Sequence, residues 1–153
     1  MMENPIIVGL VCDHAGDRID ETAKALVQNG TRIFPLYCGA NLLPSTVLDA
    51  FMKGADAVFF LSCGEGNCRY FDGNSKINRI VEMIKLQLSD LGLEPERVML
   101  FFADPFEENP LGRALEECKV TVEGLSPNPY KSEIGGVVEN GVKANGNGHD
   151  MTK

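Results

Sequence analysis

The sequence predicts an α/β fold with a flavodoxin-like parallel sheet of four to five strands and helices on both faces. Two observations lead to this prediction. Short apolar runs rich in β-branched residues alternate with longer segments of helical periodicity. The short runs are apolar almost throughout, which is typical of strands buried on both faces of a parallel sheet. Right-handed crossovers between parallel strands restrict the possible topologies, and among these the flavodoxin-like strand order 2-1-3-4 is our first choice.

The first half of the chain contains two predicted strands. Residues 5–11 (PIIVGLV) form the first, and a helix is expected from about residue 17 to residue 29, ended by Gly30. Residues 31–37 (TRIFPLY) form the second strand. Its internal Pro35 has no N–H for the ladder, which indicates a position at the edge of the sheet.

The middle of the chain contains two helices around a strongly apolar strand. Pro44 begins a helix that ends before Gly54, as is usual for proline and glycine at helix ends. Residues 57–62 (AVFFLS) are expected to be a central strand. The clearest amphipathic pattern follows over residues 75–91, where apolar residues recur at spacings of three, four and seven.

The last third of the chain changes in character. Residues 98–102 (VMLFF) form a fourth predicted strand, residues 110–118 a last helix, and residues 120–122 a short fifth strand. Beyond residue 125 proline, glycine and asparagine dominate, and too little apolar surface remains to offset the entropy of ordering. We therefore divide the chain into an α/β domain over residues 1–125 and a flexible or partner-bound tail over residues 126–153.

The charge and hydropathy of the chain exclude several functions. The formal charge is −8, which disfavours nucleic acid because phosphate binding needs clustered lysine and arginine. No apolar run is long enough to suggest a transmembrane segment, and residues 1–5 do not resemble a signal peptide. We therefore expect a cytoplasmic protein.

Cysteines follow the predicted strands. Cys12, Cys38 and Cys63 come directly after the first, second and third strand, and Cys68 lies five residues further on. Because the carboxyl ends of parallel strands share one edge and neighbouring strands are about 4.8 Å apart, four sulfurs can converge there. The fifth cysteine, Cys118, is in step with the apolar residues of the last helix and is expected in the core.

Four thiolates suit either zinc or an iron–sulfur cluster. Structural zinc sites favour close cysteine pairs, but here only Cys63 and Cys68 form one, with four residues between them. That spacing also occurs in plant-type 2Fe–2S ferredoxins, so a 2Fe–2S cluster is the first choice and 4Fe–4S the second. Gly64 and Gly66 allow the backbone to approach a cofactor closely. His14 is a further candidate ligand or hydrogen-bond donor.

Several segments resemble one known family. They are residues 53–74 with the Cys-x4-Cys-x-Tyr pattern, residues 92–98, residues 12–16 (CDHAG) and the pair Cys38-Gly39. Together they resemble the delta (iron–sulfur) subunit of methyl-viologen-reducing hydrogenase, over residues 5–103 or so. Family members often carry Cys-x-x-Cys after the first strand, whereas this chain keeps only the second of these cysteines.

The resemblance implies a function in electron transfer. It implies a 2Fe–2S cluster on Cys12, Cys38, Cys63 and Cys68, in a subunit with no catalytic residues of its own. It also implies two partners within an anaerobic, electron-bifurcating complex. One is a heterodisulfide-reductase-like flavin and iron–sulfur subunit, and the other is a second redox enzyme such as a hydrogenase, formate dehydrogenase or other reductase.

Two alternatives from other functional classes remain open on the sequence. The first is a zinc-stabilised interaction module, which would be colourless when purified without oxygen. The second is a thiol-redox protein that uses Cys63 and Cys68, at least one of them with a lowered pKa.

Overall fold

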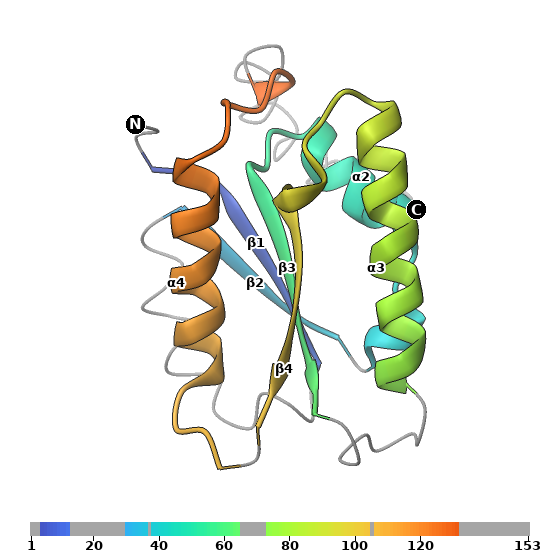
Figure 1. Cartoon of the computed structure of the whole chain (residues 1–153), viewed down its shortest axis with the longest axis vertical. Helices are drawn as coiled ribbons and strands as arrows, with labels where there is room; N and C mark the ends of the chain where they lie inside the picture. The colour runs from blue at the N-terminus through green and yellow to red at the C-terminus, as the bar shows by residue number, and fades with distance from the viewer. Residues whose placement is uncertain (1–3, 13–29, 37, 65–72, 105, 132–153) are drawn as a thin grey trace, which may run out of the picture.

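The computed structural model shows a four-stranded parallel sheet between helices (Figure 1). It describes residues 4–12, 30–36, 38–64, 73–104 and 106–131. The strands are β1 (Ile7–Cys12), β2 (Thr31–Leu36), β3 (Ala57–Cys63) and β4 (Val98–Ala103). Their spatial order is β2-β1-β3-β4, which confirms the expected order and places the Pro35-containing strand at an edge.

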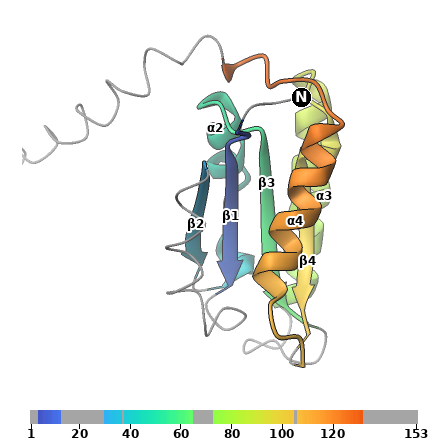
Figure 2. The same ribbon diagram turned by 90° about the vertical axis from the view of Figure 1, so that its left-hand side faces the viewer.

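The helices cover both faces of the sheet. They are α2 (Pro44–Met52), α3 (Gly73–Asp90) and α4 (Pro110–Glu123), with short 3-10 turns η2 (Gly39–Asn41) and η3 (Pro95–Arg97). In Figure 1, α4 lies on one side of the sheet and α2 and α3 on the other. Figure 2 shows the four strands side by side with α4 in front. The helix expected over residues 17–29 lies outside the described residues.

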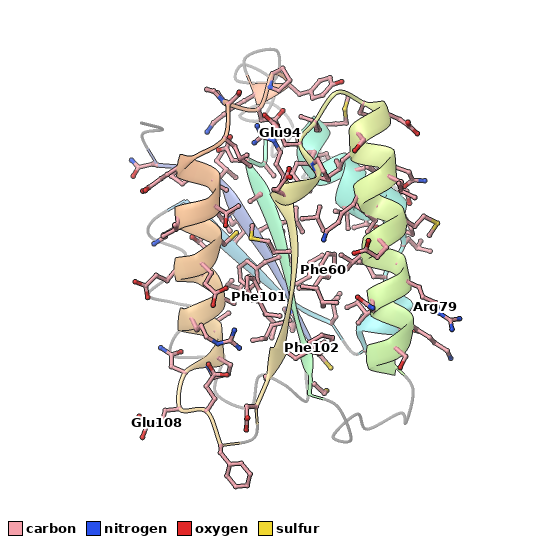
Figure 3. The ribbon with its side chains drawn as sticks, in the orientation of Figure 1. Phe60, Arg79, Glu94, Phe101, Phe102 and Glu108 are labelled. Atoms are coloured by element: carbon pink, nitrogen blue, oxygen red, sulfur yellow. The ribbon has the colours of Figure 1, made fainter. Side chains whose placement is uncertain are left out.

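Two apolar cores follow from the alternation of side chains along β3, which is buried at every position. Val58 and Phe60 join the core under α2 and α3, whereas Phe59 and Leu61 join the core under α4. Figure 3 shows this division, with Phe60 on the α3 side of β4 and Phe101 on the α4 side. The prediction of a central third strand is confirmed.

The predicted fifth strand at residues 120–122 is wrong, because α4 continues to Glu123. Cys118 and Val122 are one helical turn apart and both are buried, whereas Val120 is exposed. A strand would place Val120 and Val122 on the same face. Burial of the helical stripe thus outweighs the β preference of the two valines.

A hydrogen-bonded segment, residues 126–131, covers the amino-terminal end of the sheet. The Asn128 amide donates to the carbonyl oxygens of Phe51 and Ala55, at 2.9 and 2.6 Å. Lys131 Nζ lies 2.7 Å from the buried carboxylate of Asp56. The described part of the chain therefore packs together as far as residue 131. The division of the chain at residue 125 and the partner-bound tail remain predictions, since residues 132–153 lie outside the described ranges.

Buried Arg97 joins this segment to the sheet. Its guanidinium donates to the carbonyl oxygen of Asp56 at 2.9 Å and to that of Ser126, and its Nε lies 2.7 Å from Glu94 Oε2. The amino-terminal end of the sheet is thus closed by polar contacts. The carboxyl-terminal end, at the bottom of Figure 1, is where three of the predicted ligands lie, namely Cys12, Cys38 and Cys63.

Candidate metal centre

The structure brings two of the four predicted ligands into contact. Cys12 and Cys63 are the last residues of β1 and β3, which are neighbouring parallel strands. Their sulfur atoms are 3.4 Å apart, and both side chains are buried. Strand alternation places Cys12 on the face of Leu10 and Cys63 on the opposite face, with Leu61. Each residue is the last of its strand, where the sheet no longer separates its two faces, and this allows the two sulfurs to meet.

The 3.4 Å distance between the Cys12 and Cys63 sulfurs has a chemical meaning. A disulfide would need about 2.05 Å between the sulfurs. Two thiolates on one tetrahedral metal ion, with metal–sulfur bonds of about 2.3 Å, lie about 3.8 Å apart. The Cys12–Cys63 pair is therefore within about 0.4 Å of the spacing that two ligands of one metal ion require.

Cys38 lies at the same end of the sheet. In the register of the sheet Leu36 pairs with Cys12, and Cys38 follows two residues later. Two residues span at most about 7 Å, so the Cα of Cys38 lies within that distance of the Leu36 Cα and therefore near the end of β1. Its side chain is buried, and its carbonyl oxygen accepts a hydrogen bond from the Asn41 N–H at 3.0 Å, within the η2 turn.

The described residues do not complete a metal site. Among them, no three His, Cys, Asp or Glu side chains form a group that could hold a metal ion. The structure thus joins Cys12 to Cys63 and places Cys38 nearby without adding it to the pair. The other two candidates, Cys68 and His14, lie outside the described ranges. The four-cysteine ligand set accordingly stays a prediction.

Cys118 has the structural role expected of it. It lies on the buried face of α4, in the core on that side of the sheet. Burial raises the pKa of the Cys118 thiol to about 12, because a thiolate would lose its hydration there. Since thiolates are the metal ligands and nucleophiles, Cys118 is unsuited to either role at neutral pH.

Phe106 and Glu107, which no motif in the sequence marked as functional, lie in the loop that follows β4. Asp104 Oδ1 accepts a hydrogen bond from the Phe106 N–H at 2.9 Å, and Glu107 contacts Arg113 through bonds of 2.5 and 3.1 Å. Those bonds from Arg113 hold the pKa of the Glu107 carboxyl below its usual value. An aromatic residue between acidic ones, as in the sequence from Asp104 to Glu108, was the available signal.

Comparison with known proteins identifies similar chains. The family model described as "Methyl-viologen-reducing hydrogenase, delta subunit" matches residues 7–126. The chain is 32% identical over 144 residues to the F420-non-reducing hydrogenase vhc iron-sulfur subunit of Methanococcus voltae, covering 91% of this chain and 100% of the relative. It is also 32% identical over 133 residues to the vhu iron-sulfur subunit of Methanocaldococcus jannaschii, covering 85% of this chain and 99% of the relative.

A longer protein contains a similar segment. It is the A-type subunit of the Ferredoxin/F(420)H(2)-dependent CoB-CoM heterodisulfide reductase of Methanosarcina acetivorans, to which the chain is 25% identical over 126 residues. The match covers 80% of this chain but only 16% of that relative. A segment like this one therefore occurs both as a separate subunit and within a much larger polypeptide.

Proposed function

This chain belongs to the delta-subunit family of methyl-viologen-reducing hydrogenase, and we propose that it is an electron-transfer subunit that holds one 2Fe–2S cluster. The observation that carries the proposal is the buried Cys12–Cys63 sulfur pair at the carboxyl-terminal end of the sheet. Relatives are named iron–sulfur subunits, which supports the same cofactor class.

Each proposed ligand has a distinct origin in the fold. Cys12 and Cys63 end neighbouring strands, and their sulfurs have nearly the spacing of two ligands on one iron ion. Cys38 and Cys68 would supply the remaining two thiolates, the first from the end of β2 and the second from the residues after β3. The cluster would supply a one-electron redox step, while the burial of Cys12, Cys38 and Cys63 limits the contact of these sulfurs with water.

The charge of the protein favours a low reduction potential. Four thiolates, two sulfides and two ferric ions give a net charge of −2, and reduction makes it −3. A chain with a formal charge of −8 disfavours that added electron. We expect a potential within about 150 mV of the −400 mV or so that is typical of plant-type clusters.

We propose two redox partners. A segment like this chain is part of a much longer heterodisulfide reductase polypeptide, which supports docking of the separate subunit onto a heterodisulfide-reductase-like flavin and iron–sulfur protein. Relatives named hydrogenase subunits support a second redox enzyme as the other partner, namely a hydrogenase, a formate dehydrogenase or another reductase. The chain itself would be non-catalytic, since a single cluster works only between a donor and an acceptor.

We place the protein in the cytoplasm, where thiols stay reduced and available to metal. Within the described ranges, every helix is too short or too polar to cross a bilayer.

Anaerobic purification tests the cofactor. A 2Fe–2S protein is red-brown and contains about two iron and two acid-labile sulfide per chain. Cys12→Ser and Cys63→Ser should each abolish the native visible spectrum. Cys118→Ser is the matched control, because this cysteine is buried in the core under α4, and its spectrum should equal that of the unsubstituted protein.

The two alternatives predict other results. A zinc-stabilised interaction module gives a colourless protein with zinc in place of iron and sulfide, and the 3.4 Å sulfur pair would suit that ion as well. A thiol-redox protein gives a metal-free chain in which Cys63 or Cys68 reacts with iodoacetamide at neutral pH. Either result would replace the electron-transfer proposal.

A further inference from the structure

Phe106 is the most exposed large apolar side chain among the described residues. It is 94% exposed, in the loop that joins β4 to α4. A phenylalanine in this position gains nothing from burial within its own chain. Single exposed apolar residues are common on protein surfaces, so the case for a docking role depends on the loop, the charges and the neighbouring cysteines described next.

Hydrogen bonds constrain the backbone at Phe106 and Glu107. The Phe106 and Glu107 N–H groups both donate to Asp104, at 2.9 Å to Oδ1 and 3.0 Å to the carbonyl oxygen. Arg113 from α4 contacts the Glu107 carboxylate and also donates to the carbonyl oxygen of Phe102 at 3.0 Å. The side chain is thus presented by a hydrogen-bonded turn, which lowers the entropy cost of binding through it.

The loop adjoins the sulfur pair. Ala103, the last residue of β4, pairs with Cys63 in the register of the sheet. Phe106 follows three residues later, so its Cα lies within about 11 Å of the Ala103 Cα. Figure 3 shows Phe102 and Glu108 at this same end of the sheet. A protein that covers Phe106 is consequently brought close to the candidate metal centre.

The charge around Phe106 is negative. Asp104 and Glu108 are both exposed. Among the described residues of this loop, the acidic side chain that forms an ion pair is Glu107. The cation of that pair, Arg113, also contacts Glu117, so its charge is already shared between two carboxylates. An exposed aromatic ring within an acidic surface matches an apolar socket with a basic rim.

We propose that Phe106 is the anchor by which this chain docks onto its heterodisulfide-reductase-like redox partner, in an apolar socket of that protein rimmed by lysine or arginine. The identity of the partner rests on the proposed function, whereas the role of Phe106 rests on its exposure, its hydrogen-bonded backbone, its place near Cys63 and the acidic residues beside it. The same acidic surface repels nucleic acid and anionic membranes.

The test measures binding to the purified heterodisulfide-reductase-like flavoprotein of the same organism, by anaerobic calorimetry with the metal-loaded protein. Phe106→Ala should raise the dissociation constant about 30-fold, as for a central aromatic anchor. Leu86→Ala is the matched control, because Leu86 is 71% exposed on α3 and its removal should leave the dissociation constant within about twofold.

Charge is tested with the double variant Asp104→Asn and Glu108→Gln. Asparagine keeps the oxygen that accepts from the Phe106 N–H, so the turn is retained while its charge is removed. The variant should bind more slowly and lose most of the salt dependence of the association rate. The visible spectrum of each variant is recorded in parallel, since it reports the metal centre and not the docking.

The outcomes separate the two proposals. Equal binding by Phe106→Ala and the unsubstituted protein, or an unsubstituted protein that does not bind the flavoprotein, overturns the docking proposal. A colourless protein whose binding still depends on Phe106 overturns the 2Fe–2S proposal and leaves the docking surface in place.

Discussion

Replacing Asn128 by alanine should destabilise the domain strongly, although its position resembles a disordered tail in sequence. Asn128 is 2% exposed, its amide donates to two carbonyl oxygens, and its Oδ1 accepts from the Tyr130 N–H at 3.0 Å. The Phe51 carbonyl oxygen keeps another donor, the Gly54 N–H, but the contact to Ala55 is lost.

The magnitude follows from these contacts. Three lost hydrogen bonds at a net value near 1 kcal/mol each, with one buried acceptor left poorly paired, amount to about 3 kcal/mol. For a domain of this size that corresponds to a fall of roughly 10 °C in Tm. The fall in Tm is measured by thermal unfolding followed by circular dichroism, with all variants prepared at the same metal content. Asn78→Ala, on the exposed face of α3, is the control and should change stability by less than about 0.5 kcal/mol.

Truncation extends the same test. Removing residues 132–153 should leave Tm unchanged, whereas removing residues 126–153 should lower it at least as much as Asn128→Ala, because the Lys131–Asp56 contact is lost as well. If Asn128→Ala and Asn78→Ala have the same Tm, the segment over residues 126–131 does not stabilise the domain and the reasoning fails.

Three further predictions concern the loop, the sheet and the core. Glu107→Gln should lower stability by less than about 1 kcal/mol at pH 7, because the Arg113 pair is partly exposed. Because the Glu107 pKa is lowered in the folded state, the stabilisation by this pair is fully present above the unfolded-state pKa and is lost as pH falls through the folded-state pKa. Equilibrium unfolding should therefore show a stability difference between Glu107→Gln and the unsubstituted protein at pH 7 but a smaller one at about pH 3. A difference that is as large at low pH would contradict the assignment. Gly9→Ala should lower the free energy of unfolding by about 1–3 kcal/mol, because the added Cβ would lie 2.5 Å from the Phe59 ring. Chemical denaturation measures this change, and a variant more stable than the unsubstituted protein would contradict the close contact between Gly9 and Phe59. Cys118 should resist iodoacetamide in the folded metal-loaded protein and react on unfolding, as mass spectrometry can show; rapid labelling of the native protein would contradict its burial.

The strands were predictable from sequence because short apolar runs alternate with helical periods, although β2 and β4 are mostly half-buried or exposed. The run from Ala57 to Cys63 is buried at every position, so its central place follows from composition alone. The error at residues 120–122 has a different origin. Val120 and Val122 favour a strand locally, but only Val122 is buried in the core, and tertiary packing stabilises the helix instead.

The candidate site was predictable in part. Cys12 and Cys63 end neighbouring strands, which predicted that they lie close together, but strand alternation places them on opposite faces, so the contact between their sulfurs is seen only in the structure. Cys38 follows its strand through a turn, and no sequence rule fixes where such a turn points its side chain. Asn128 was missed because composition cannot reveal that one amide bonds two distant carbonyl oxygens. Phe106 was missed because exposure of a loop residue depends on the packing of the whole domain.

Diffraction at the iron absorption edge, from crystals of the anaerobically purified protein, decides whether Cys12 and Cys63 share one metal ion. We predict anomalous signal from iron at the carboxyl-terminal end of the sheet, with one iron ion bonded to both of these sulfurs and the sulfurs about 3.8 Å apart. Iron bonded elsewhere, zinc in its place, or two sulfurs without a shared metal ion would contradict the proposed electron-transfer function.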